Sequence, residues 1–146
     1  MKKLYLDVDG VFLTKKNTQA AENVDKLLNY ILPRFDCYWL TTHCHGGDSS
    51  VLLDMLSTYF PQETLCKLRK IKPSTWDTLK TEAIDFESDF YWIDDYVFQA
   101  EKRVLKQHNC LDRLVLVDLS REKELINIVS TLDALIDSLE IEEESQ

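Results

Sequence analysis

The sequence predicts a single α/β domain with three layers, in which helices cover both faces of a five-stranded parallel sheet. Three observations lead to this fold class. Short apolar runs alternate with segments whose apolar residues recur at helical spacing. The runs are apolar on both faces, which is typical of parallel strands buried beneath helical crossovers. The length of 146 residues fits one domain, and we expect residues 1–140 to form it, followed by an acidic tail at 141–146.

Five strands are expected, each followed by a helix. The strands are the apolar runs at 4–8, 37–40, 65–68, 90–93 and 114–117, of which the third is the weakest. The helices are expected over 20–31, 49–60, 73–84, 97–105 and 125–139. Ser49 or Ser50 supplies a cap for the second helix, which Pro61 ends, and Pro73 opens the third. No internal repeat or linker divides the chain.

The composition argues against several function classes. The chain carries 17 Lys and Arg residues against 26 Asp and Glu residues, and the resulting net charge of −9 disfavours nucleic acid as a partner. No apolar run approaches the ~18 residues of a membrane span, and Asp7 interrupts the start before a signal peptide can build up. The four cysteines are scattered without a C-x-x-C pair. We therefore expect a cytoplasmic protein with reduced thiols and no membrane contact.

Polar residues stand where the expected strands end. Ligands of parallel α/β domains bind beyond the carboxyl ends of the strands. In chain order these ends carry Asp7, Asp9 and Gly10, then Thr41, Thr42 and the His-Cys-His run at 43–45, then Lys70 and Lys72, then Asp94 and Asp95, and finally Asp118. Carboxylates gathered at one edge repel one another, and a hard cation such as Mg²⁺ offsets that repulsion. We expect Asp7 and Asp94, at the ends of adjacent central strands, to bind Mg²⁺.

These residue types suit phosphoryl transfer. A carboxylate in line with a bound phosphorus atom can act as the nucleophile and form an aspartyl-phosphate. Asp9 lies two residues beyond Asp7, on the same side of an extended chain, where it can protonate the leaving oxygen and later activate water. Thr41 and a lysine would hold the phosphoryl oxygens in the transition state.

Four short segments together resemble the four motifs of the haloacid dehalogenase-like (HAD) superfamily. They are Leu6-Asp7-Val8-Asp9-Gly10-Val11, Tyr38-Trp39-Leu40-Thr41, a downstream lysine and Trp92-Ile93-Asp94-Asp95, and they span nearly the whole chain in the family's order. The resemblance implies a Rossmann-like, Mg²⁺-dependent phosphatase with Asp7 as nucleophile and Asp9 as acid and base. It further implies phosphate binding by Thr41 and metal binding by Asp7, the backbone carbonyl of Asp9, Asp94 and the adjacent Asp95.

Two lysines fit the third motif. Lys80 resembles the Lys-Thr helix start of superfamily members whose fourth strand ends in Trp-Ile-Asp-Asp, and Lys72, before Pro73, resembles the other common form. A helix that begins at Pro73 would put Lys80 two turns away, roughly 10 Å from its start, which favours Lys72. We favour Lys80 and keep Lys72 as the alternative.

The chain has no room for the cap domain that selects substrates in many members of this superfamily. About ten residues separate Asp9 from the first expected helix, enough for a short flap. The stretch from Thr41 to Lys80 is already occupied by a helix, a strand and part of another helix. Capless members tend to act on large substrates or to borrow a lid from a partner subunit. We therefore expect a phosphorylated substrate, either macromolecular or covered by a second copy in a homodimer.

Three other interpretations concern the same residues. A HAD-fold protein with the same side chains and a blocked mouth would bind phosphate or a partner without turnover. A receiver domain is also built around a phosphorylated aspartate, but receivers place a lysine after strand five, where this chain has Asp118. A zinc site at the His-Cys-His run lacks a second cluster of ligands, so we expect that run to form a wall of the substrate mouth.

Overall fold

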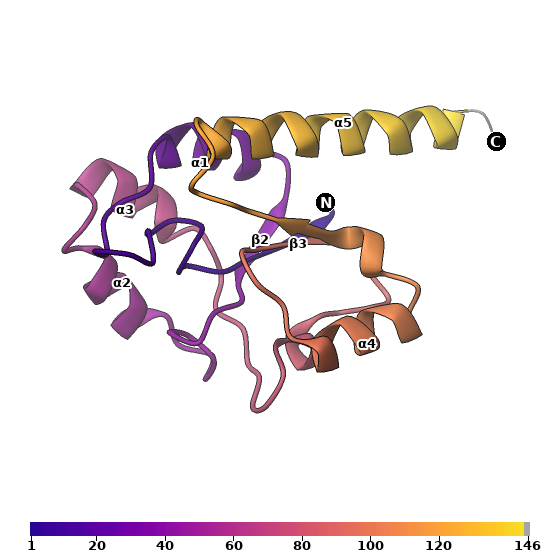
Figure 1. The fold of residues 1–146 in the computed structure, drawn as a ribbon, viewed down its shortest axis with the longest axis horizontal. Coiled ribbons are helices and arrows are strands. Elements are labelled where there is room, and N and C mark those ends of the chain that lie inside the picture. Colours follow the sequence, from indigo (N-terminus) through magenta and orange to yellow (C-terminus); the bar gives the residue numbers. More distant parts are fainter. Residues whose placement is uncertain (145–146) are drawn as a thin grey trace.

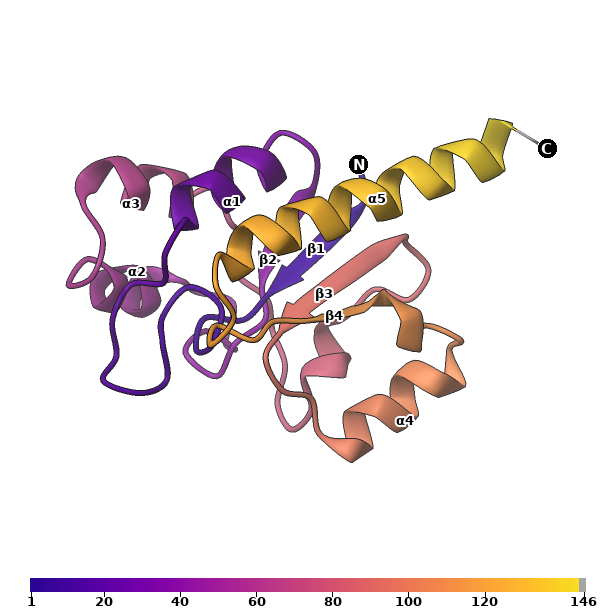
Figure 2. The ribbon, with the colours of Figure 1, turned by 45° about the horizontal axis from the view of Figure 1, so that its top comes forward.

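A four-stranded parallel sheet lies between two layers of helices (Figure 1). The structure is a computed structural model that describes the backbone of residues 1–144 and the side chains of residues 1–138. The strands are β1 (Lys3–Leu6), β2 (Asp36–Trp39), β3 (Phe90–Asp94) and β4 (Leu114–Leu116), in the spatial order β2-β1-β3-β4 (Figure 2). The expected α/β class with a parallel sheet is confirmed, and the expected number of five strands is wrong.

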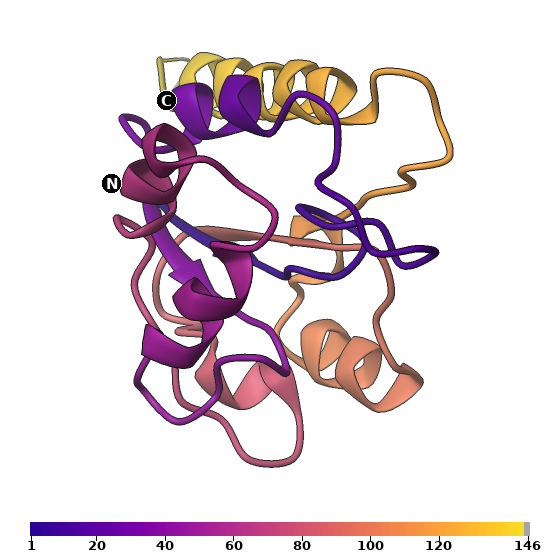
Figure 3. The same cartoon turned by 90° about the vertical axis from the view of Figure 1, so that its left-hand side faces the viewer.

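Helices cover both faces of this sheet. Figure 3 shows α1 (Val24–Ile31) and α5 (Glu124–Glu144) side by side in one layer and α4 (Gln99–Gln107) in the opposite layer. The short 3-10 helix η1 (Lys80–Ala83) packs against α4. The remaining elements are α2 (Ser50–Leu56), α3 (Gln62–Leu68), which contacts α1, and a second 3-10 helix, η2 (Leu111–Arg113), before β4.

Alternating side chains of the central strands fill two separate cores. In β1, Leu4 and Leu6 join the core beneath α1 and α5, while Tyr5 joins the core beneath α4. In β3, Ile93 and Trp92 divide in the same way, and every residue of that strand is buried. Burial on both faces is the reason that these strands are apolar throughout.

The strand expected at 65–68 is instead the end of helix α3. Pro61 stands at the N-cap of that helix, and Glu63 lies in its first turn, where the helix dipole favours a negative charge. Leu65 and Leu68 are both buried, three residues apart on one face. A run of four apolar residues fits either a strand or one face of a buried helix, and the proline decides for the helix.

The edge of the sheet beside β2 carries one bridge where a fifth strand would lie. The backbone N–H of Lys72 donates to the carbonyl of Cys37 at 2.9 Å, and the N–H of Trp39 donates to the carbonyl of Lys72 at 2.8 Å. The pairing ends there because the hydroxyl of Ser74 bonds to the Trp39 carbonyl.

The helix expected at 73–84 forms only the short turn η1. The carboxylate of Glu82 accepts the backbone N–H groups of Thr78 and Leu79 and so satisfies them outside a helix. Lys80 therefore lies at the start of a helical turn rather than two turns inside a helix.

Other boundaries differ by a few residues. The first helix begins at Val24 rather than at residue 20, since Asn23 adopts a left-handed conformation with φ 67°. We refer to residues 10–20 as the flap; its Leu13 and Ala20 form an antiparallel bridge. The backbone of α5 includes residues 141–144 of the expected acidic tail, and residues 145–146 lie outside the described part. None of the described helices combines the length and apolarity needed to cross a bilayer.

Candidate active site

Two buried carboxylates and one lysine meet at the carboxyl end of the central strands. Asp7 directly follows β1 and Asp94 ends β3, and the N–H of Asp7 donates to the carbonyl of Ile93 at 3.1 Å. Asp7 is 7% exposed and Asp94 is 1% exposed. The Lys80 ammonium lies 2.8 Å from Asp94 Oδ2 and 3.4 Å from Asp7 Oδ2. Two neighbouring strand ends and the start of η1 thus bring together three of the residues that the sequence singled out.

The carboxylate of Asp94 is held by several donors. The backbone N–H groups of Asp95 and Tyr96 donate to its Oδ1 at 2.8 and 3.2 Å, and Trp92 Nε1 donates to its Oδ2 at 3.2 Å. Burial, and then the charge of Asp7, raise the pKa of Asp94 to about 8 against the opposing effect of Lys80. The pair of carboxylates is therefore a place where a further cation would be bound favourably.

Lys80 keeps its positive charge at this position. Burial by itself would lower the pKa of Lys80, but the charges of Asp7 and Asp94 outweigh it and raise that pKa above its ordinary value. The backbone of Lys80 is fixed by the buried Glu101, whose carboxylate accepts the N–H of Lys80 at 2.9 Å and the N–H of Phe98 at 3.1 Å. Glu101 thereby ties the start of η1 to the start of α4.

Lys72, the alternative lysine, lies elsewhere. Its ammonium pairs with Asp36 Oδ1 at 2.8 Å, and Asp36 is the first residue of β2, at the end of the sheet opposite Asp7. The structure therefore brings Lys80, and not Lys72, to the carboxylates.

Three carboxylates have a geometry that fits a divalent cation. Oxygens of Asp7, Asp94 and Asp95 all lie within 4.8 Å of one another. Mg²⁺ takes oxygen ligands at about 2.1 Å, so ligands on opposite sides of the ion lie about 4.2 Å apart. The donor set fits Mg²⁺ in chemistry, and the limit of 4.8 Å between its oxygens is close to that spacing. The side chain of Asp9 is not part of this set. Asp95 Oδ2 also lies 2.7 Å from the ammonium of Lys15 in the flap.

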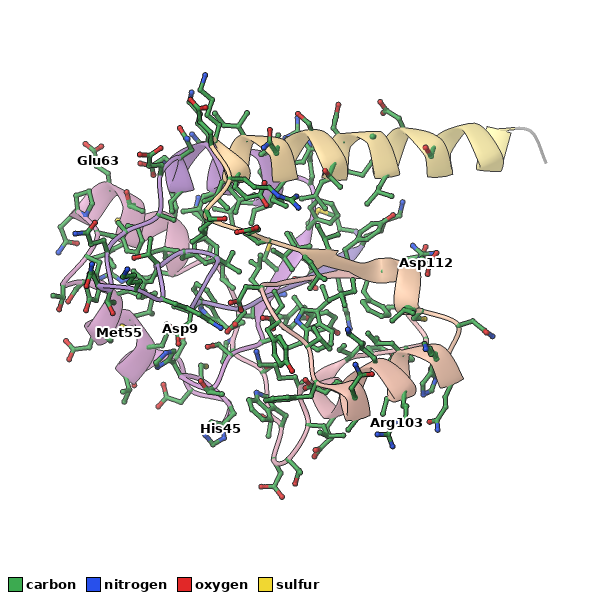
Figure 4. All side chains as sticks on the ribbon, in the orientation of Figure 1. Asp9, His45, Met55, Glu63, Arg103 and Asp112 are labelled. Atoms are coloured by element: carbon green, nitrogen blue, oxygen red, sulfur yellow. The ribbon has the colours of Figure 1, made fainter. Side chains whose placement is uncertain are left out.

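Asp9 and Thr41 lie on the loops after β1 and β2, and His43 links them. His43 Nε2 lies 2.8 Å from Asp9 Oδ2, and the N–H of His43 donates to the hydroxyl of the fully buried Thr41 at 3.3 Å. In Figure 4, Asp9 and His45 lie on one side of the molecule, and Asp112, which precedes β4, lies on the opposite side. The His-Cys-His run thus stands beside the expected site, at the ends of the strands.

A cavity of about 690 Å³ adjoins the carboxylates. Gly10 and Asp95 line it next to the site, and its other walls come from the flap and from the loop after β4. These walls are formed by Thr14, Lys15, Lys16, Leu116, Val117, Asp118, Leu119, Ser120 and Arg121. Pockets of this size accommodate small-molecule ligands or part of a larger one.

Three contacts in the site were missed by reasoning from the sequence. The contact of His43 with Asp9 and that of Lys15 with Asp95 join residues on separate loops, and no local pattern signals them. Glu101 follows the N-cap residue Phe98 by three positions, which is the spacing of a capping box. Because Phe98 is not a usual capping residue, that signal was weak.

Comparisons with known proteins do not assign the chain to a family. No protein-family model matches the chain, and a search of curated proteins found no match. The function is therefore inferred from the contacts of the chain's own residues.

Proposed function

We propose that the protein is a Mg²⁺-dependent phosphomonoester hydrolase, a capless HAD-like phosphatase that forms an aspartyl-phosphate on Asp7. One observation carries this proposal: the Lys80 ammonium lies 2.8 Å from Asp94 and 3.4 Å from Asp7 at the ends of two adjacent strands. A nucleophile, a cation for the phosphoryl oxygens and oxygen ligands for a metal ion thus share one edge of the sheet. These are the parts that phosphoryl transfer requires.

In the first step, a carboxylate oxygen of Asp7 attacks the phosphorus atom of the substrate. The bond from phosphorus to the leaving oxygen breaks, and the proton on Asp9 passes to that oxygen, so the products are an alcohol and the aspartyl-phosphate. Lys80 and the hydroxyl of Thr41 hold the phosphoryl oxygens as their charge redistributes. Because Asp7 and Asp94 are buried, water screens their charges only weakly.

In the second step, Asp9 acts as the base. Its carboxylate takes a proton from water, and the oxygen of that water attacks the phosphorus atom of the aspartyl-phosphate. The bond between Asp7 and phosphorus breaks, inorganic phosphate leaves, and both aspartates return to their starting states.

Asp7, Asp94 and Asp95 would hold the Mg²⁺ ion, together with the backbone carbonyl of Asp9. When bound, the ion offsets the negative charge of the carboxylates and of the substrate phosphate. Lys80 contributes a second positive charge beside Asp7 and Asp94. We infer that the leaving group of the substrate lies in the cavity beside Gly10 and Asp95.

The experiment that tests this function is phosphate release from 4-nitrophenyl phosphate, measured with Mg²⁺ and with EDTA. We expect release by the wild type that requires Mg²⁺ and falls at least about 1,000-fold in Asp7→Asn. Asp36→Asn is the matched control, because it makes the same chemical change at the opposite end of a neighbouring strand. Retained activity in a folded Asp7→Asn protein, or no release by the wild type, would contradict the proposal.

A further inference from the structure

We propose that His43 is a positioning residue that holds the carboxyl group of Asp9 for proton transfer to the leaving group. The inference rests on the proposed function, since it assigns a part in that reaction to a residue outside the motifs. Its basis is the distance of 2.8 Å between His43 Nε2 and Asp9 Oδ2.

The chemistry of this contact leaves one oxygen of Asp9 for the substrate. In the proposed arrangement Nε2 of His43 carries a hydrogen and donates a hydrogen bond to Oδ2, which can accept it whether or not Oδ1 carries a proton. The other oxygen, Oδ1, then carries the proton that passes to the leaving group. Because Oδ2 accepts the same hydrogen bond before and after the transfer, the carboxyl group keeps its orientation through both steps.

The backbones on both sides of the contact are fixed. The N–H of His43 donates to the buried hydroxyl of Thr41, and the N–H of Cys44 donates to the Thr41 carbonyl at 3.2 Å. On the other side, Asp9 forms a bridge with Leu13 in the flap. The loops after β1 and β2 thus present the two side chains to each other from hydrogen-bonded backbones.

Stability alone gives little reason for this contact. The side chain of His43 is 38% exposed and that of Asp9 is 43% exposed. Pairs this exposed contribute little to folding, because water screens the charges and competes for the hydrogen bond. The main effect of the contact is to restrict the side-chain conformations of Asp9, the residue that transfers the proton.

A role in proton donation predicts a dependence on the leaving group. An alkyl alcohol leaves only with a proton, whereas 2,4-dinitrophenolate is a weak base and leaves without one. The value of kcat/KM covers the steps from substrate binding through loss of the leaving group. It therefore includes the step in which Asp9 acts as the acid and excludes the step in which Asp9 acts as the base. Disturbing the position of Asp9 should therefore affect kcat/KM for alkyl phosphates selectively.

The test compares His43→Ala, His43→Gln and the control His108→Ala on an alkyl phosphate and on 2,4-dinitrophenyl phosphate. For His43→Ala we expect kcat/KM to fall at least about tenfold on the alkyl phosphate and less than about threefold on the dinitrophenyl ester. His43→Gln keeps a donor and should recover part of the loss. His108, the C-cap residue of α4, stacks on Phe86 with ring centroids 3.9 Å apart, so His108→Ala should leave both values unchanged.

Equal losses on the two substrates would overturn the role of His43 in positioning Asp9 and would indicate a contact with the phosphoryl group. No loss on either substrate would overturn it as well. Failure of the proposed function gives a different result: the wild type hydrolyses neither ester, or Asp7→Asn remains active. If the wild type is active and Asp7→Asn is inactive, the proposed function holds, and the His43 variants then test only the positioning role of His43.

Discussion

Gly10 lies against the side chain of Asp95 so closely that a Cβ atom at position 10 would overlap the Asp95 carboxyl group. Gly10 also has a φ of +81°, a conformation that side chains of L residues rarely adopt. The glycine of the Asp-x-Asp-Gly segment therefore makes room for a carboxylate that comes from the end of a different strand. The backbone of Gly10 passes directly beside Asp95, the third carboxylate of the proposed metal site.

We expect Gly10→Ala to weaken both the fold and the site. The overlap and the positive φ should lower the free energy of unfolding by about 1–3 kcal/mol. Displacement of Asp95 should raise the Mg²⁺ concentration needed for half-maximal activity by about tenfold. Urea denaturation and a Mg²⁺ titration of phosphate release measure the two effects. Gly46→Ala is the control, since a Cβ there meets open space; equal results for the two variants would contradict the prediction.

Lys80→Met should abolish most of the activity, because it removes the cation nearest the proposed nucleophile. We expect kcat/KM to fall about 100- to 1,000-fold, as for the loss of other groups that stabilise transition-state charge. Lys72→Met makes the same change at an exposed pair with Asp36, so its kcat/KM should stay within about twofold of the wild type. Steady-state kinetics on 4-nitrophenyl phosphate give kcat/KM for the two variants. The reverse order of effects would assign the phosphate-binding role to Lys72.

Glu101→Gln should act on the reaction through Lys80. The carboxylate accepts two backbone N–H groups, whereas the amide has one carbonyl oxygen and turns an NH₂ group toward the second donor. We expect the free energy of unfolding to fall by about 1–3 kcal/mol. We also expect kcat/KM to fall about tenfold, because one of the two bonds that tie the start of η1, and with it Lys80, to α4 is lost. A destabilised variant with unchanged kcat/KM at a temperature where it is fully folded would limit Glu101 to a structural role.

The packing of α1 on α5 should depend on pH in the alkaline range. The hydroxyl of Tyr30 donates to Asp133 at 2.9 Å, and burial, followed by this carboxylate, raises the pKa of Tyr30 from 10.0 to about 12. The folded state thus favours the protonated phenol. Its contribution is complete below the unfolded pKa and is lost as the pH rises from about 10 to about 12.

Tyr30→Phe tests this contribution by removing the titrating group. Near neutral pH we expect the variant to be about 0.5–1.5 kcal/mol less stable than the wild type. At about pH 11 that difference should shrink, because only the wild type loses stability by ionisation of this side chain. Denaturation curves at the two pH values give the comparison. A difference that is the same at both would show that Tyr30 does not titrate as proposed.

The fold could be predicted where burial alone determines the pattern. The segments around Leu6 and Ile93 are apolar on both faces because both faces are covered, and they were recognised as strands. The segment at 65–68 is short and apolar for a different reason, since Leu65 and Leu68 line one side of a helix. Periodicity over four residues does not separate these cases, and Pro61 at the N-cap decides for the helix.

The sequence was sufficient to predict which residues form the site, but not the contacts between them. Asp7 and Asp94 were found because strand ends in a parallel sheet share one edge. The choice between Lys80 and Lys72 depended on where the helix expected at 73–84 begins. That start is set by hydrogen bonds of Ser74 and Glu82, which helix propensity does not describe. The link between His43 and Asp9 spans 34 residues and exists only once both loops are folded.

The bridge at Lys72 has a consequence for the behaviour of the protein in concentrated solution. An unpaired sheet edge is a template on which further chains can add as strands. On the β2 side, the groups of Cys37 and Trp39 are already bonded to Lys72, whose charged side chain would have to be desolvated by an incoming strand. On the other side, β4 offers only three residues. Self-association through the sheet edges is therefore disfavoured.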